Sequence, residues 1–126
     1  MYSNVSEKEV LLHLFGLIEV ETNFVNYLTL DDGKSFGVFS MRWTTAENVA
    51  EQREEGFNEY KLTHYEEKQI KYGVYHFYKL LQRTQCLDKA IISYNQGSVD
   101  VDEYFHNYLF LVRGRVDYLK ERWELE

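Results

Sequence analysis

Apolar residues recur at helical spacing along most of this chain, and this periodicity constrains it to a mainly helical fold. The pattern is strongest over residues 66–83 and 101–123, where residues three and four positions apart share one face of a helix. The stripe of the first stretch is formed by Ile70, Val74, Phe77, Tyr78 and Leu81. The stripe of the second is formed by Val101, Tyr104, Phe105, Tyr108, Val112, Val116, Leu119 and Trp123. No proline interrupts either stretch.

The ends of two further helices carry capping signals. Ser6 followed three residues later by Glu9 is a capping box, and Thr44 with Glu47 is a second one. Gly56 suits the C-terminal end of the helix that Thr44 begins. The predicted helices cover, in order, residues 6–23, 45–55, 66–83, 86–94 and 101–123.

Residues 25–41 predict a β-hairpin between the first two helices. Residues with a preference for strands alternate on either side of Asp31-Asp32-Gly33-Lys34, which is typical turn sequence. Residues 57–65 show no periodicity and are expected to be irregular. Gly73 lies inside a predicted helix at a cost of about 1 kcal/mol relative to alanine, which close packing against another backbone would explain. The fold class expected is mainly α, an α+β arrangement of five helices and one short hairpin in a single domain over residues 1–126.

Glu21 lies on the apolar stripe of the first helix. The stripe contains Val10, Leu14, Ile18, Glu21 and Val25, whereas Glu19 points away from it. A carboxylate on a core-facing stripe is costly unless it is paired or stays protonated. Two interpretations remain open: the helix end has already reached solvent, or Glu21 is an acid of the kind found at functional sites.

Charge and composition argue against several classes of function. The chain of 126 residues has a formal net charge of −7 and no cluster of Lys and Arg, so nucleic-acid binding is not expected. A single cysteine, Cys86, excludes an internal disulfide, and the four histidines lack metal-binding spacing, so neither a metal nor a cofactor is expected. No signal peptide and no apolar run of about 20 residues is visible, so we expect synthesis in the cytoplasm and no membrane span.

Four short blocks stand in a fixed order along the chain. They are Glu21-Thr22-Asn23-Phe24, Gly37-Val38-Phe39-Ser40-Met41 with Thr44-Thr45-Ala46 after it, Gln69-Ile70-Lys71-Tyr72-Gly73, and Ser93-Tyr94-Asn95-Gln96-Gly97. The series resembles the motifs E-S-x-F, G-L-M-Q-[IL] with S-T-A, N-I-x-x-G and A-Y-N-A-G of the soluble lytic transglycosylases, whose catalytic domain is lysozyme-like and related to goose-type lysozymes. Each block alone is weak, and their order over about residues 8–119 carries the resemblance.

The resemblance implies an enzyme that cleaves the β-1,4 bond between N-acetylmuramic acid and N-acetylglucosamine in peptidoglycan. Glu21 matches the catalytic acid of the family, which serves as acid and then as base. The substrate's N-acetyl group assists and its 6-hydroxyl closes a 1,6-anhydro ring, so no second carboxylate is required. The resemblance also implies that Tyr94 positions Glu21 or the sugar, that Asn95 binds substrate, and that Tyr108 lines the groove.

Each of these residues also has an ordinary structural explanation. Tyr94 and Tyr108 can be core tyrosines, and Asn95 can be a residue of a helix end. Asp31 and Asp32 can be simply turn residues. Alternatively, one of them is the second carboxylate that a hydrolytic lysozyme would use together with Glu21.

The chain also departs from the family. Ser40 stands where the family has a glutamine that contacts substrate, and its shorter hydroxyl has a different reach. The negative charge repels anionic wall polymers at low salt. These departures favour the alternative that the protein keeps a lysozyme-like fold without catalysing and serves as a structural component of a virion or secretion apparatus.

The leading expectation is a murein lyase that acts on peptidoglycan glycan strands. A compact chain without a visible signal peptide suits a bacteriophage protein, either within the virion or as an endolysin that acts at the bacterial cell wall. Other virion or secretion-apparatus proteins are the partners expected under the structural alternative.

Overall fold

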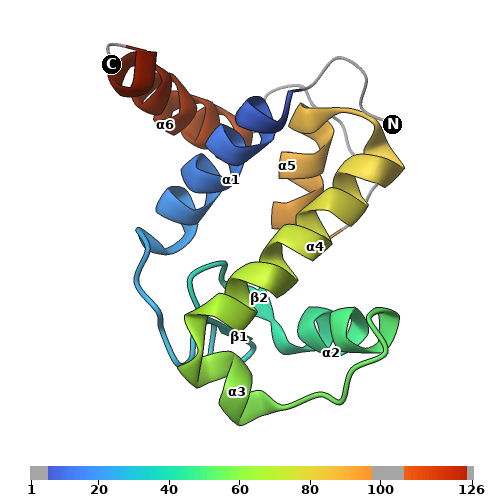
Figure 1. Ribbon diagram of the computed structural model, residues 1–126. Helices are drawn as coiled ribbons and strands as arrows, with labels where there is room; N and C mark the ends of the chain where they lie inside the picture. The colour runs from blue at the N-terminus through green and yellow to red at the C-terminus, as the bar shows by residue number, and fades with distance from the viewer. Residues whose placement is uncertain (1–5, 98–106, 125–126) are drawn as a thin grey trace. The chain divides into compact units, whose positions relative to one another are not determined.

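The computed structural model describes residues 6–97 and 107–124, which are mainly helical (Figure 1). The helices are α1 (Glu7–Thr22), α2 (Trp43–Gln52), α3 (Glu59–His64), α4 (Glu66–Thr84), α5 (Leu87–Gln96) and α6 (Asn107–Glu124). Two short strands, β1 (Ser35–Phe36) and β2 (Met41–Arg42), form an antiparallel pair in which Phe36 faces Met41. The expected class, mainly α with one small sheet, is confirmed.

The chain forms two compact units. The first consists of the described residues within 1–20 and 77–126, and the second consists of residues 21–76. The chain passes from one unit to the other inside α1, after Val20, and inside α4, after His76.

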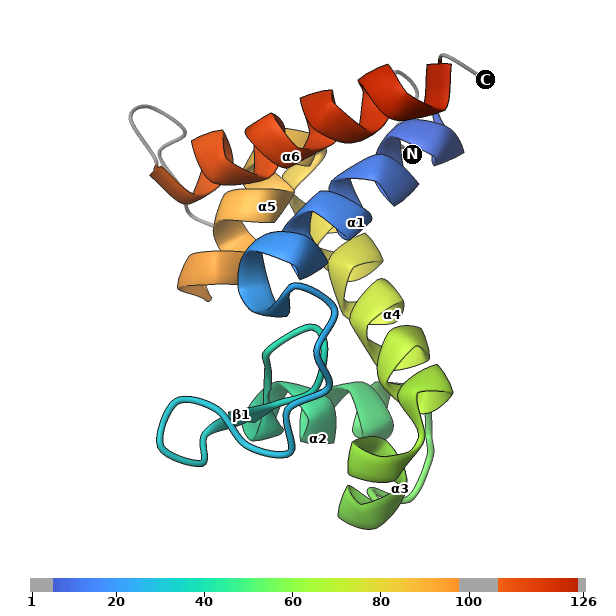
Figure 2. The same ribbon diagram turned by 90° about the vertical axis from the view of Figure 1, so that its left-hand side faces the viewer.

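In the first unit, a glycine allows α1 and α6 to pack closely. A Cβ atom placed on Gly16 would lie 3.2 Å from the backbone oxygen of Val112 and 3.1 Å from a methyl group of Val116. Figure 2 shows the two helices side by side. The buried apolar residues of this unit include Val10, Leu12, Leu14, Leu17, Ile18, Phe77, Leu80, Leu81, Ala90, Ile91, Ile92, Leu109, Val112 and Val116.

Ion pairs lie around this apolar core. They join Glu9 to Lys120, Glu19 to Arg115 and Asp88 to Arg113. All six side chains keep part of their surface in solvent, and exposed pairs of this kind contribute at most about 1 kcal/mol each. Apolar burial therefore accounts for most of the stability of the first unit.

The second unit contains the sheet, α2, α3 and the first part of α4. The rings of Phe36 and Trp43 stack with their centroids 3.9 Å apart, where β2 continues directly into α2. The buried apolar residues of this unit are Phe36, Val38, Phe39, Met41, Ala46, Val49, Ala50, Leu62 and Tyr72.

The two capping predictions had different outcomes. For the first, the capping role of Ser6 is confirmed, because the backbone N–H of Glu9 donates to the Ser6 hydroxyl at 3.1 Å. The second is wrong, because α2 begins at Trp43, and the residue before it, Arg42, makes no side-chain cap. Thr44 is already inside the first turn, where a side chain cannot serve as the N-cap.

The predicted end of α2 is also wrong. The helix stops at Gln52, and Glu54 takes the left-handed conformation with φ +56°. Gly56 therefore does not occupy the left-handed position at which glycine is favoured.

The stretch 57–65, expected to be irregular, contains the short helix α3. Asn58 begins it, because its side chain accepts the backbone N–H of Lys61 at 2.9 Å. A helix of 6 residues spans too few turns to produce a recognisable apolar stripe. The Asn58 cap was the available signal.

The hairpin has a different register from the one predicted. The turn at residues 31–34 is present, closed by a bridge between Leu30 and Ser35, but residues 25–29 form no strand. The paired strands β1 and β2 instead flank a second turn, residues 37–40, and residues 35–39 are all buried instead of alternating. This turn is fixed by side chains from elsewhere in the unit, described below, and not by a long ladder of backbone hydrogen bonds.

The longer helices agree better with the sequence. The prediction of α4 is confirmed, and α5 continues two residues further than expected, to Gln96, before Gly97 ends it with φ +82°. The predicted start of α6 near residue 101 lies outside the described residues, as do Val101, Tyr104 and Phe105. With α3 included, the described residues form six helices instead of five.

Candidate functional site

Three of the four sequence blocks meet at Val38 in the second unit. The hydroxyl of Thr22, at the end of α1, donates to the backbone oxygen of Val38 at 2.6 Å. The backbone N–H of Val38 donates to the side-chain oxygen of Gln69, in α4, at 3.1 Å. Residues separated by 16 and 31 positions in sequence are thus joined through the two polar backbone groups of one residue.

Two glycines in these blocks make the contact possible. A Cβ atom on Gly37, which has φ +76°, would lie 2.5 Å from the side-chain oxygen of Gln69. A Cβ atom on Gly73 would lie 2.3 Å from the ring of Phe39. The expectation of close packing at Gly73 is therefore confirmed, although the neighbour is an aromatic ring and not a backbone.

Gln69 is the centre of this polar connection. Its side chain is 3% exposed, and its amide nitrogen donates to the backbone oxygen of Leu62 at 2.7 Å and to the side-chain oxygen of Asn26 at 2.9 Å. With Val38 on its oxygen, the amide has a partner for each of its strong hydrogen-bonding groups. One side chain therefore fixes α3, α4 and the turn that carries Ser40.

Glu21 lies in the last turn of α1 and is partly buried. The stripe that leads to it is confirmed, because Val10, Leu14 and Ile18 are all buried. Its predicted continuation to Val25 is wrong, because α1 ends at residue 22 and Val25 is 45% exposed. The carboxylate therefore stands at the boundary between the buried stripe and solvent, next to Thr22.

The helix ends abruptly after Glu21. Asn23 and Phe24 both adopt the left-handed conformation, with φ of 53° and 65°. Asparagine tolerates this region, whereas Phe24 reaches it at a cost of about 1 to 2 kcal/mol, and such strained residues cluster at functional sites. The bond from Thr22 to Val38 is one contact that holds this strained end in place.

Ser40 occupies a similarly unusual backbone position. It has φ +49°, is partly buried, and lies in the turn closed by its own N–H donating to the oxygen of Gly37 at 3.1 Å. Ser40 is the position at which the family resemblance implies a substrate contact, and strained backbone residues are enriched at functional sites.

Asp31 and Asp32 lie on the other turn. Both are exposed and left-handed, with φ of 52° and 57°, a conformation that aspartate tolerates better than most residues. The N–H of Gly33 donates to Leu30 at 3.0 Å and completes the turn. Turn chemistry accounts for the presence of both aspartates.

The remaining candidates belong to the first unit. Tyr94 is partly buried and Asn95 is exposed, both in the last turns of α5. Tyr108 is partly buried in the first turn of α6. The candidate residues are thus divided: Glu21, Ser40 and the two aspartates lie in one unit, and these three lie in the other.

Thr22 and Gln69 belong to the sequence motifs, but the sequence predicts no structural or functional role for either. Gln69 had a signal that could have been used, because it precedes Tyr72 by three residues and Gly73 by four and so shares their face of α4. No signal in the sequence pairs it with Val38.

Two other features bear on the kind of site. Within residues 6–97 and 107–124, no group of three or more His, Cys, Asp or Glu side chains is placed to hold a metal ion. In the same part of the chain, no helix combines the length and apolarity that crossing a membrane requires. Comparison with protein-family models, curated proteins and solved structures gave no match.

Proposed function

We propose that this protein is a peptidoglycan lytic transglycosylase with a lysozyme-like fold, in which Glu21 is the general acid and base. The observation that carries the proposal is the contact among three of the four family-like blocks at Val38. These blocks were selected for their order in the sequence alone. In the fold, a side chain of the first block and one of the third both bond to the backbone of the second.

In the proposed reaction, Glu21 donates its proton to the oxygen that links the two sugars, and the bond from that oxygen to the anomeric carbon of N-acetylmuramic acid breaks. The substrate's N-acetyl group stabilises the electron-poor carbon. Glu21, now a carboxylate, removes the proton of the 6-hydroxyl, whose oxygen bonds to the anomeric carbon. The product is a 1,6-anhydro sugar, and no water is consumed.

The surroundings of Glu21 suit this task. Glu21 is partly buried at the end of an apolar stripe and keeps part of its surface in solvent, where a substrate can reach it. Thr22 anchors the turn of α1 that carries it. Ser40 is the proposed substrate contact on the neighbouring turn. The family resemblance also makes Tyr94, Asn95 and Tyr108 candidate substrate contacts.

Digestion of purified peptidoglycan, followed by mass spectrometry, tests the proposal. Wild type should release fragments with 1,6-anhydro ends, and Glu21→Gln should reduce the rate by at least about a hundredfold, since it removes the proton donor but keeps the shape. Glu19→Gln is the matched control on the same helix and should retain most of the activity. Equal loss in both variants would count against a specific role for Glu21.

The products also separate the alternatives. Fragments with reducing ends would identify a hydrolytic lysozyme, and Asp31→Asn with Asp32→Asn should then abolish the activity. The absence of any cleavage by folded wild type over a range of pH and salt would favour a structural component. The presence of Ser40 where the family has a glutamine is the observation that favours this last alternative.

A further inference from the structure

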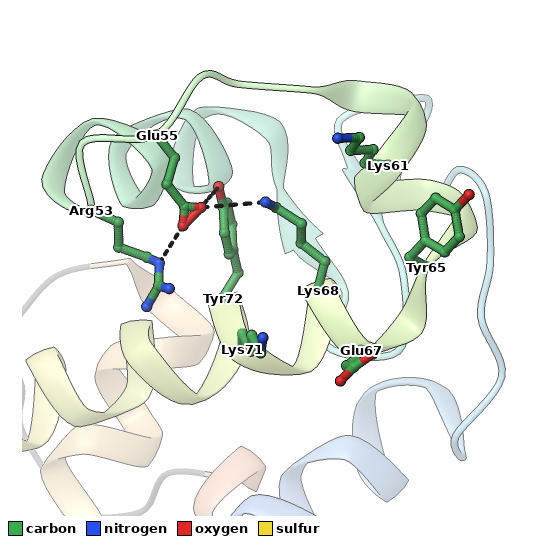
Figure 3. A pocket seen from close by; sticks show the side chains of 8 residues that line it. All are labelled: Arg53, Glu55, Lys61, Tyr65, Glu67, Lys68, Lys71 and Tyr72. Carbon is green, nitrogen blue, oxygen red and sulfur yellow. Dashed lines mark hydrogen bonds and ion pairs between the residues drawn. The ribbon is translucent and has the colours of Figure 1, made fainter.

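A second, separate feature of the second unit is a pocket beside α4. It has a volume of about 420 Å³, is open to solvent, and lies between the segment after α2, α3 and the first turns of α4 (Figure 3). Four basic side chains line it: Arg53, Lys61, Lys68 and Lys71. The other charged lining residues are two glutamates, so basic side chains outnumber acidic ones by two in a chain whose net charge is −7.

Glu55 holds one side of this pocket in a fixed arrangement. Its carboxylate accepts from Arg53 Nε at 2.7 Å, from Lys68 Nζ at 3.3 Å and from the Tyr72 hydroxyl at 3.3 Å (Figure 3). The hydrogen bond from Arg53 is the largest of the contributions that lower the pKa of Glu55. The carboxylate is therefore charged at neutral pH and already surrounded by donors, so that it orders two of the four cations.

The other two cations have no such partner. Lys61 and Lys71 are exposed, and within the described residues neither ammonium group forms an ion pair. In Figure 3, Lys61 comes from α3 and Lys71 from α4, so the two approach the pocket from different elements. Glu67, the remaining acid, is exposed and precedes Lys71 by four residues on α4.

The tyrosines give the pocket an apolar surface as well. Tyr65 is 57% exposed, so a flat ring face is available beside the lysines. The Tyr72 ring is buried, and burial is the main reason that the pKa of its hydroxyl is raised, which keeps it a hydrogen-bond donor to Glu55. A pocket of this volume is larger than a single inorganic anion requires.

We propose that this pocket binds a small ring-containing ligand that carries an oxyanion, a phosphate or a carboxylate. The anionic group is attracted by the basic side chains of the lining, which include Lys61 and Lys71, and the ring of the ligand lies against Tyr65. The charge of Lys and the oxygen acceptors of an oxyanion are complementary. This site is independent of Glu21 and of the cleavage proposed above.

Calorimetric titration and amide NMR with four probes test the proposal. Glucose 6-phosphate and glucuronate carry the ring with a phosphate and a carboxylate, glucose lacks the anion, and inorganic phosphate lacks the ring. The charged sugar that binds more tightly identifies the preferred oxyanion. We expect its dissociation constant to be at least about fivefold lower than that of inorganic phosphate. Shifted amides should include those of residues 61, 65, 68 and 71.

Paired lysine variants provide the control. Lys61→Ala with Lys71→Ala should weaken binding of the preferred sugar about tenfold or more, whereas Lys8→Ala with Lys34→Ala removes the same charge from exposed positions outside the pocket and should change it less than about twofold. Tyr65→Ala should bring the sugar's affinity down to that of inorganic phosphate. Equal weakening in both lysine pairs, or no binding of either charged sugar to wild type, would overturn the proposal.

Discussion

The two compact units are stabilised by different kinds of contact. In the first, helices meet through aliphatic side chains, and the helical Gly16 brings α1 onto the backbone of α6. In the second, turns and short helices meet through buried polar groups, with Gln69 bonded to Val38, Leu62 and Asn26. The non-glycine residues with left-handed φ are also concentrated there, with Gln85 the exception among the described residues.

The difference indicates where function is to be expected. Apolar contacts between helices tolerate changes of similar volume, whereas a polar network specifies one arrangement and is costly when incomplete. The second unit therefore keeps Glu21 and Ser40 in defined positions despite its small amount of regular secondary structure. Four predictions test how far this comparison holds, beginning with the one of largest expected effect.

Gln69→Leu should destabilise the protein by about 3 to 4 kcal/mol, because it leaves the N–H of Val38 and the oxygen of Leu62 without their partner in a buried setting. Urea unfolding followed by circular dichroism measures the change. Gln82→Leu, an exposed glutamine on the same helix, is the control and should change stability by less than about 0.5 kcal/mol. Similar values for both variants would show that the polar network is not what stabilises the second unit.

Gly73→Ala should cost about 2 kcal/mol, although alanine favours helices, because its Cβ would lie 2.3 Å from the ring of Phe39. Phe39 is buried, with 2% of its surface exposed. The same unfolding experiment measures the effect. A stabilised Gly73→Ala variant would contradict the close packing, and Gly73→Ala combined with Phe39→Leu should recover part of the loss if the clash is the cause.

The comparison also explains what the sequence could and could not predict. Helices with a regular apolar stripe, such as α1 and the described part of α6, were predicted because their spacing is a local property. In α4 the same reasoning placed Ile70 on the core face, but Ile70 is 47% exposed while its neighbour Gln69 is 3% exposed. Gln69, and not Ile70, lies in the core, because partners distant in sequence form hydrogen bonds with the Gln69 amide.

The candidate site was predictable to a similar extent. The sequence identified Glu21, Ser40 and Gly73 as members of ordered blocks. No rule of residue spacing predicts that these blocks contact one another in the second unit. The helix α3 was missed because its 6 residues show no apolar stripe, although its Asn58 cap could be read from the sequence. The register of the hairpin was missed because it depends on a contact with Gln69, 31 positions away. Contacts of this kind become visible only when the chain is folded.

Gly114→Ala should stabilise the protein by about 0.5 to 1 kcal/mol, which is the opposite of Gly73→Ala. Gly114 lies inside α6, and a Cβ atom there would meet nothing within 4 Å. Alanine has a higher helix propensity than glycine and reduces the conformational entropy of the unfolded chain. At this position it does so without a steric clash. A melting temperature higher by about 3 °C is the expected result. A lower one would mean that this face of α6 makes a contact that requires the glycine.

The smallest effect expected concerns two carboxylates, one in each unit. The pKa of Glu55 is lowered mainly by the hydrogen bond from Arg53, and the pKa of Glu9 mainly by that from Lys120. Each group therefore contributes stability above its usual pKa of 4.5, and this contribution is lost as the pH falls through the lower value of the folded state.

Glu55→Gln and Glu9→Gln should each reduce stability at pH 7, and the deficit relative to wild type should shrink as the pH is lowered below 4.5. Both pairs are exposed, so about 0.2 to 1 kcal/mol is the expected range, and added salt should reduce it. Urea unfolding at pH 7 and pH 3 measures the difference. Glu55 has three side-chain donors, whereas Glu9 relies on Lys120 and the more distant His13, so Glu55→Gln should show the larger change. The reverse order would mean that the polar contacts of the second unit are no stronger than the surface pairs of the first.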